Sequence, residues 1–185
     1  MSSTTPETTP STTPQTSAQT QGINASRWRI EPARSSVSFR SPGVWGLVKV
    51  KGEFERYSGT LDLRRKPAVE LTLDAASLNT HNTMRDKHLR SPDFFDVENH
   101  PQVRFVSDSA TLDGEQLRVR GRLDAAGESM PLDLTASVRR VGDELEVDAR
   151  TEADQHQLGM THSPLGMVRS PSELTVHARL VRNAD

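Results

Sequence analysis

Residues that could perform acid, base or metal chemistry gather in one stretch of the sequence, residues 81–106 (HNTMRDKHLRSPDFFDVENHPQVRFV). The candidates for proton transfer or metal binding there are His81, Asp86 and His88, and a second pair is His156 with His162. Neither group has the i, i+4 spacing that places two imidazoles on one helical face, and the chain has no HExxH motif. We therefore expect no metal site and no required cofactor.

Nucleophilic catalysis lacks its usual residues in this chain. The absence of cysteine removes thiolate catalysis, disulfides and cysteine-type zinc sites. There is no G-x-S-x-G motif, and Ser91 precedes a proline, where it suits a helix cap. We therefore expect a protein that is not an enzyme, in which Asp86 caps a helix and His88 forms hydrogen bonds.

Length and charge limit the remaining classes of function. The 185 residues suffice for one domain with a full core, and the net charge of -2 offers no basic surface for a phosphate backbone. No stretch approaches the roughly 18 consecutive apolar residues of a membrane span. We expect neither a nucleic-acid partner nor a membrane-spanning segment.

The first 26 residues differ in composition from the rest. They are almost entirely Ser, Thr, Pro and Gln, with Glu7 as the only charge, so they cannot bury enough surface to offset their chain entropy. They also lack the basic start and the apolar run of about 7 to 15 residues of a secretory signal. We expect a disordered tail over 1–26, one domain over 27–185, and a cytoplasmic location.

From Trp28 onward, apolar and polar side chains alternate with a period of two, which predicts strands with one dry face. The alternation covers residues 36–40, 48–55, 61–63, 69–73, 103–105, 117–123, 130–138, 145–149 and 174–180. Turn signals separate many of these runs, at Ser58-Gly59, Asp113-Gly114, Ala126-Gly127 and Gly142-Asp143. Together the runs and turns predict an antiparallel meander.

About eight such strands must bury their dry faces either inside a closed barrel or between two stacked sheets. The period alone does not choose between these. The chain has only five Phe, two Trp and one Tyr to fill so many strands, and an under-filled eight-stranded barrel holds a ligand cavity.

The stretch 81–106 interrupts the strands with helical signals. Thr83 and Asp86 have the spacing of a capping box, which predicts a helix from Met84 to about Arg90. A second cap at 91–93, with proline at the first helical position, predicts a short turn that carries Phe94 and Phe95. Such an insertion lies across an open sheet edge or over a barrel mouth, where the phenylalanines would form a plug or gate.

The same residues carry a resemblance to a known family. The core is residues 85–96 (RDKHLRSPDFFD), followed by His100-Pro101 and the strand 103–105. Matching flanks are Ser36-Val37-Ser38-Phe39, Val50-Lys51-Gly52-Glu53-Phe54, Arg120-Gly121-Arg122-Leu123 and Met130-Pro131-Leu132. On these motifs, residues 28–182 resemble the YceI-like family of bacterial polyisoprenoid-binding, lipocalin-like proteins.

The resemblance implies an all-β fold, an extended eight-stranded antiparallel lipocalin-like β-barrel with a short helical insertion near its mouth. It further implies a long apolar channel that binds, carries or sequesters an isoprenoid chain, as in quinones or polyprenyl lipids. One passage departs from the family: relatives often show an Arg-x-Asp-Phe-Gly-like sequence where this chain has residues 155–160 (QHQLGM).

Candidate ligand-binding residues follow from the channel hypothesis. Arg85, Asp86 and His88 are the nearest polar groups for a lipid head group. The full candidate set is Phe39, Trp45, Phe54, Met84, Arg85, Asp86, His88, Leu89, Phe94, Phe95 and Phe105. The expected partner is an isoprenoid or other long-chain lipid. An exposed sheet edge or the barrel mouth is compatible with a homodimer, but no residue requires one.

Two alternatives stay open at this point. One is an enzyme that acts on a lipid-like substrate in the same cavity. The other is an interaction module whose barrel is filled by its own side chains, so that Phe39, Phe54 and Phe105 are ordinary core residues.

Overall fold

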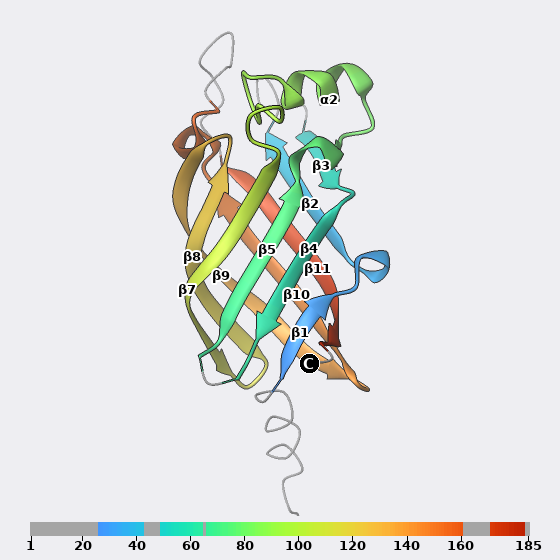
Figure 1. The fold of residues 1–185 in the computed structure, drawn as a ribbon, viewed down its shortest axis with the longest axis vertical. Helices are drawn as coiled ribbons and strands as arrows, with labels where there is room; N and C mark the ends of the chain where they lie inside the picture. The colour runs from blue at the N-terminus through green and yellow to red at the C-terminus, as the bar shows by residue number, and fades with distance from the viewer. Residues whose placement is uncertain (1–25, 43–48, 65, 161–170, 184–185) are drawn as a thin grey trace, which may run out of the picture.

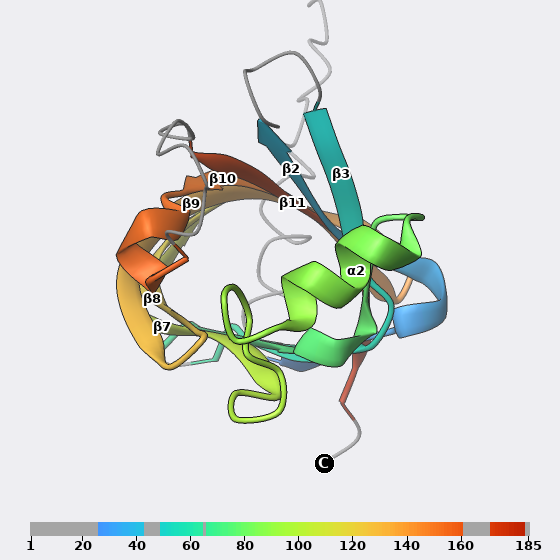
Figure 2. The same ribbon diagram turned by 90° about the horizontal axis from the view of Figure 1, so that it is seen from above.

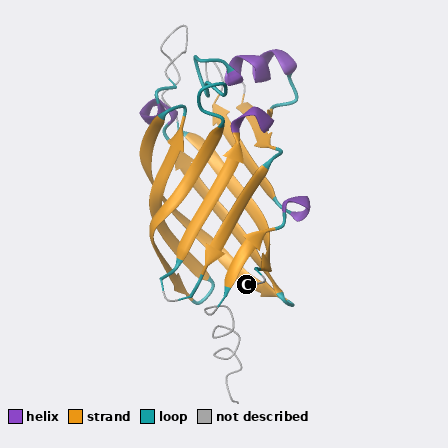
Figure 3. Ribbon diagram, viewed as in Figure 1, coloured by secondary structure: helices purple, strands orange, loops and turns teal. Residues whose placement is uncertain are grey.

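The computed structural model describes residues 26–42, 49–64, 66–160 and 171–183, which form a β-barrel with helical segments outside its wall (Figures 1 and 3). The strands are β1 (Arg27–Ile30), β2 (Ser36–Pro42), β3 (Lys49–Phe54), β4 (Tyr57–Asp62), β5 (Ala68–Asp74), β6 (Leu78–Asn79), β7 (Gln102–Asp113), β8 (Gln116–Ala125), β9 (Glu128–Val141), β10 (Glu144–Ala153) and β11 (Ser172–Arg182). The helices are α2 (Thr83–Arg90) and the 3-10 turns η1 (Pro32–Arg34), η3 (Ala75–Ser77) and η4 (Gln155–Leu158).

Eight antiparallel strands close the barrel. They follow the order β1-β4-β5-β7-β8-β9-β10-β11, and β11 pairs back with β1, where Ile30 lies opposite Leu180. The closed ring confirms the predicted eight-stranded antiparallel barrel and decides against two stacked sheets.

The period-two pattern explains the wall directly. Along β8 the side chains of Leu117, Val119 and Leu123 are buried inside, while Arg118, Arg120 and Arg122 point outward and are exposed. β1 lies at the end of the barrel away from α2 (Figure 1). Trp28 on β1 and Leu145 at the start of β10 are fully buried in the core and do not line the cavity described below; these two residues are here called the floor.

The opposite end of the barrel is open on one side. η1 splits the first strand into β1 and β2, and a kink at Glu55-Arg56 splits the second into β3 and β4. At this end β2 pairs with β11 on one side and with β3 on the other. The other edge of β3 pairs with the two-residue strand β6 and not with β5. Figure 2 shows β2 and β3 leaning away from the rest of the wall, with α2 beside the gap.

Three of the four predicted turns are confirmed. Gly114, Gly127 and Gly142 lie between consecutive strands with positive φ values of 59°, 82° and 64°. The Ser58-Gly59 prediction is wrong, because both residues lie inside β4. A Cβ on Gly59 would come within 2.7 Å of the Ile30 Cδ1 atom, so this glycine permits close packing and the chain reverses only after Asp62.

The helix α2 is confirmed at Thr83–Arg90, but its predicted cap is wrong. Asn82 is the N-cap, and its side-chain oxygen accepts a hydrogen bond from the Arg85 amide at 3.0 Å. Asp86 does not return a capping bond, because its carboxylate is turned toward Thr80. After α2, hydrogen-bonded turns carry Phe94 and Phe95, as predicted.

Candidate ligand-binding cavity and its lid

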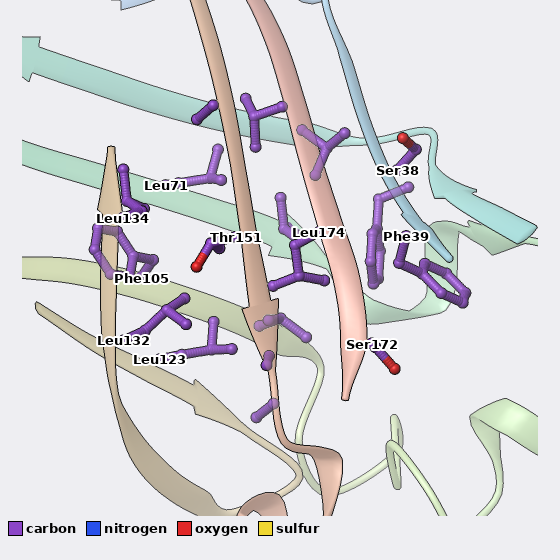
Figure 4. A pocket seen from close by; sticks show the side chains of 18 of the residues that line it. Ser38, Phe39, Leu71, Phe105, Leu123, Leu132, Leu134, Thr151, Ser172 and Leu174 are labelled. Carbon is purple, nitrogen blue, oxygen red and sulfur yellow. The ribbon is translucent and has the colours of Figure 1, made fainter. Parts of the chain in front are cut away.

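An apolar cavity of about 440 Å³ occupies the barrel between the floor and α2. This volume lies within the roughly 300–1,000 Å³ of small-molecule pockets in proteins. Figure 4 shows Leu123, Leu132, Leu134 and Leu174 among the side chains that line it. The cavity shows that the barrel is not filled by its own side chains.

Most of the predicted ligand-binding residues line this cavity. Those that do are Phe39, Phe54, Arg85, His88, Leu89, Phe94, Phe95 and Phe105. Met84 and Asp86 do not: the Met84 side chain is 81% exposed, and Asp86 is buried within the lid. Trp45 lies outside the described residues. Ligand contact by any of these residues stays a prediction.

Aliphatic side chains make up much of the cavity wall, and those on the strands are absent from the predicted ligand-binding set. Leu71, Leu123, Leu132, Leu134 and Leu174 line the cavity from four different strands. Each lies at an inward position of the period-two pattern, so the pattern contained the signal. The predicted set contains Leu89 from the lid but no aliphatic residue of the strands, although an aliphatic ligand would contact these most.

Residues 83–97, here called the lid, contact the wall through aromatic rings. The Phe95 ring lies edge-on to that of Phe54, with centroids 6.0 Å apart, and Phe54 lies 6.0 Å from Phe39. Within the lid, the His88 imidazole contacts the Phe94 ring at 4.9 Å. Phe94 and Phe95 are half-buried and line the cavity from the lid, and their role as a gate stays a prediction.

A buried polar network anchors the lid. The Asp86 carboxylate accepts hydrogen bonds from the Thr80 amide at 2.8 Å and from the Thr80 hydroxyl at 2.5 Å. Arg85 donates to the Thr80 hydroxyl at 2.8 Å and to its carbonyl at 2.7 Å. Arg90 donates to the Leu78 carbonyl at 2.5 Å. The polar residues of α2 thus fasten the lid to β6 and the residue after it.

The segment before the lid is also fixed by charge. Asp74 caps η3 by accepting from the Ala76 amide at 2.9 Å. Arg56, at the kink between β3 and β4, donates to the same carboxylate at 2.9 Å. This hydrogen bond is the main reason that the pKa of Asp74 is lowered. Because the carboxylate is ionised at neutral pH, it joins the kink to η3.

A polar cluster at the mouth was missed by the sequence analysis. Ser41 at the end of β2, Gln155 in η4 and Ser172 at the start of β11 line the cavity and form hydrogen bonds with one another. They are far apart in the chain and carry no motif. Only the pairing of β11 with β2 brings the two serines together.

The histidines do not assemble a metal site in the described part of the chain. No group of three or more His, Asp or Glu side chains there could hold an ion. His81 lies 3.7 Å from the Glu53 carboxylate, and Asp86 is engaged by Thr80. His162 lies outside the described residues.

Among the helices that are described, none has the length and apolar character needed to cross a bilayer.

Sequence comparison identifies relatives of this chain. A family model described as "YceI-like domain" matches residues 28–180. Protein YceI of Escherichia coli O6:H1 is 38% identical over 118 residues, which cover 62% of this chain and 61% of that protein. Protein YceI of Salmonella arizonae is 34% identical over the same shares. The chain therefore spans about 61% of the length of these curated relatives.

Solved structures share the fold at lower sequence identity. BcnA of Burkholderia cenocepacia superposes with a TM-score of 0.74 at 20% identity, covering 81% of this chain and 98% of that one. A polyisoprenoid binding domain from Saccharophagus degradans, implicated in plant cell wall breakdown, superposes with a TM-score of 0.70 at 14% identity, covering 84% and 98%. At these identities the likeness concerns the fold.

Proposed function

Because the chain belongs to the YceI-like domain family, we propose that it binds and carries a lipid with an isoprenoid chain, held in the barrel cavity. The observation that carries the proposal is the apolar cavity of about 440 Å³, closed at one end by a packed floor and covered at the other by a lid. The structural neighbour described as a polyisoprenoid binding domain supports the same class of ligand.

The energetics of the cavity suit a prenyl tail. Burial of apolar surface contributes about 25 cal/mol per Å². A branched hydrocarbon chain would bury its whole length against the leucine walls and would leave no polar group unsatisfied, because it has none. Affinity can therefore arise with few specific contacts, and a head group needs polar partners only at the mouth.

The described polar lining supports a carrier and not a catalyst. Ser41 and Ser172 form hydrogen bonds with each other and with the Gln155 side chain. A neutral amide cannot accept a proton from a serine at neutral pH, so these hydrogen bonds do not activate either serine as a nucleophile. We infer that the bound lipid is released unchanged.

Extraction of the purified protein tests the proposal. Organic-solvent extraction followed by mass spectrometry should identify a prenyl-chain lipid in about stoichiometric amount, and the emptied protein should take up a fluorescent prenyl analogue. Failure to find a co-purified lipid, together with no uptake of the analogue, would overturn the carrier function.

Replacing Leu134 by tryptophan should weaken uptake of the prenyl analogue at least tenfold. Leu134 points into the cavity from β9, and the larger indole would occupy the volume that a tail needs. Overpacking costs about 1–3 kcal/mol, so the variant should still fold. Fluorescence titration measures the binding, and thermal unfolding measures the stability.

The matched control introduces the same side chain on the outside. Asp133, the preceding residue, is exposed, and its ion pair with Arg120 at 3.6 Å is a surface contact of little energy. Asp133→Trp should bind the analogue as the wild type does. Equal binding by both variants would place the ligand elsewhere.

A further inference from the structure

Three uncharged side chains converge at the mouth of the cavity. The Ser41 and Ser172 hydroxyl oxygens are 2.6 Å apart, and the Gln155 side-chain carbonyl lies 3.2 Å from Ser41 Oγ and 3.0 Å from Ser172 Oγ. Ser172 is buried, with 8% of its surface exposed. These three residues, here called the mouth triad, come from β2, η4 and β11.

The hydroxyl hydrogens of the mouth triad determine which hydrogen-bond donors and acceptors it can offer a ligand. The two hydroxyls have two hydrogens, which suffice for a chain in which Ser41 donates to Ser172 and Ser172 donates to the Gln155 carbonyl. The carbonyl of Gln155 then faces the serines, and its NH₂ group is left as a donor. The Ser41 oxygen keeps its capacity as an acceptor. The triad thus presents one donor group and one acceptor, without charge.

Few charged residues line the described part of the cavity. Arg85 is the one guanidinium there, and the one carboxylate, Glu70, belongs to an exposed residue of β5. The Arg85 guanidinium is already engaged, since two of its nitrogens donate to Thr80. A lipid phosphate carries a charge of about -1.5 to -2 and is bound tightly only where cations meet it. Besides Arg85, the described lining has two imidazoles, His88 and His156, and no cluster of permanent cations.

We propose that the mouth triad binds an uncharged oxygen-bearing head group, a carbonyl or a hydroxyl, and that the protein selects neutral prenyl lipids over their phosphorylated forms. This inference rests on the proposed function, since it concerns the head group of the same lipid. The Gln155 NH₂ group donates to a head-group oxygen, and the Ser41 oxygen accepts from a hydroxyl head group. The tail lies below, against the leucine walls.

A matched ligand pair tests the selection. Displacement of the fluorescent analogue should be measured with geranylgeraniol and with geranylgeranyl phosphate, which share one tail and differ in the head group. The alcohol should bind at least tenfold more tightly than the phosphate at low ionic strength. If neither displaces the analogue and no lipid co-purifies, the proposed function fails. If the phosphate binds as tightly as the alcohol or more tightly, the carrier function stands and the selection of neutral head groups is overturned.

Two glutamines of η4 provide a charge-matched pair of variants. Gln155→Arg places a cation in the cavity mouth and should reduce the preference for the alcohol at least tenfold. Gln157→Arg adds the same charge at an exposed position of the same turn and should leave the preference unchanged. An equal shift in both variants, or no shift in Gln155→Arg, would overturn the role of the mouth triad.

A smaller substitution covers the case in which Gln155→Arg does not fold. Ser41→Ala removes the hydroxyl that begins the series of hydrogen bonds in the mouth triad, and it adds neither volume nor charge. It should weaken binding of the alcohol by roughly two- to tenfold, the effect of one neutral hydrogen bond, and leave binding of the phosphate unchanged. Unchanged affinity for the alcohol in a folded Ser41→Ala protein would contradict the inference.

Discussion

Asp86→Ala should release bound lipid about 5- to 150-fold faster than the wild type, because the variant loses the buried anchor of the lid. Both hydrogen bonds from Thr80 end on one oxygen of the Asp86 carboxylate. Their loss leaves the buried amide and hydroxyl of Thr80 without this acceptor, at a cost of about 1–3 kcal/mol. This cost destabilises the closed state of the lid and not the open state. It therefore shifts the equilibrium between the two states toward the open one by about 5- to 150-fold. Stopped-flow dilution of the fluorescent prenyl complex into lipid vesicles measures the release rate.

Two further variants separate anchoring from general damage to the helix. Asp86→Asn keeps an oxygen at the same position and should retain slow release, since a neutral amide oxygen can accept both bonds. Lys87→Ala changes the next residue, which is exposed, and should behave as the wild type. A folded Asp86→Ala protein that releases lipid at the wild-type rate would show that the lid does not limit release.

The wall and the cavity could be predicted because their signals are local. The alternation in β8 and β9 determines which side chains face inward, whatever the neighbouring strands are. The scarcity of aromatic residues then indicated an interior that is not full, and the cavity agrees with it. The position of the lid followed from helical signals placed between two strand patterns.

The details of the lid and the mouth could not be predicted, because they depend on contacts distant in sequence or on choices between equivalent partners. Asp86 has the spacing of a capping residue. In the folded protein, β6 places Thr80 next to it, and the Asp86 carboxylate accepts hydrogen bonds from Thr80 instead of capping the helix. Ser41 and Ser172 are 131 residues apart, and neither belongs to a motif. Their contact exists only after the barrel closes.

Glycine in a strand was equally ambiguous in the sequence. The sequence predicts a turn at Gly59, but this residue lies in β4, where a neighbouring side chain comes close. Gly121 fits the inward pattern of β8 and has no side chain to bury. In both cases the missing Cβ makes room for another residue, and the sequence does not say which one.

Gly121→Ala should lower the free energy of unfolding by about 1–3 kcal/mol, the cost of overpacking a tight interior. A Cβ at this position would lie 2.4 Å from the Val106 carbonyl oxygen and 2.7 Å from Cζ of Phe105. The sign is diagnostic, because glycine to alanine in unstrained backbone stabilises a protein by about 0.4–1 kcal/mol. For a chain of this size the melting temperature should fall by roughly 2–12 °C. Thermal unfolding followed by circular dichroism measures it.

Gly52→Ala provides the comparison within the same barrel. Its Cβ would come within 2.4 Å of Cζ of Phe39 and 2.9 Å of Cγ2 of Thr80, and both atoms are ends of side chains. The end of a side chain can move aside, whereas a carbonyl in a paired strand cannot move without disturbing its hydrogen bonds. Gly52→Ala should therefore destabilise the protein less than Gly121→Ala. The reverse order would show that the backbone contact is not the larger cost.

A double-mutant cycle then divides the cost at Gly121 between ring and backbone. Phe105→Leu alone should destabilise the barrel, because the buried ring fills space beside Gly121. In the Gly121→Ala background the same change should cost at least 0.5 kcal/mol less, on the scale of couplings between touching residues, since it also removes the overlap with the new methyl group. Strictly additive effects would assign the whole cost to the Val106 carbonyl. That outcome would mean that Gly121 is required by the spacing of β7 and β8, and not by the phenylalanine that lies over it.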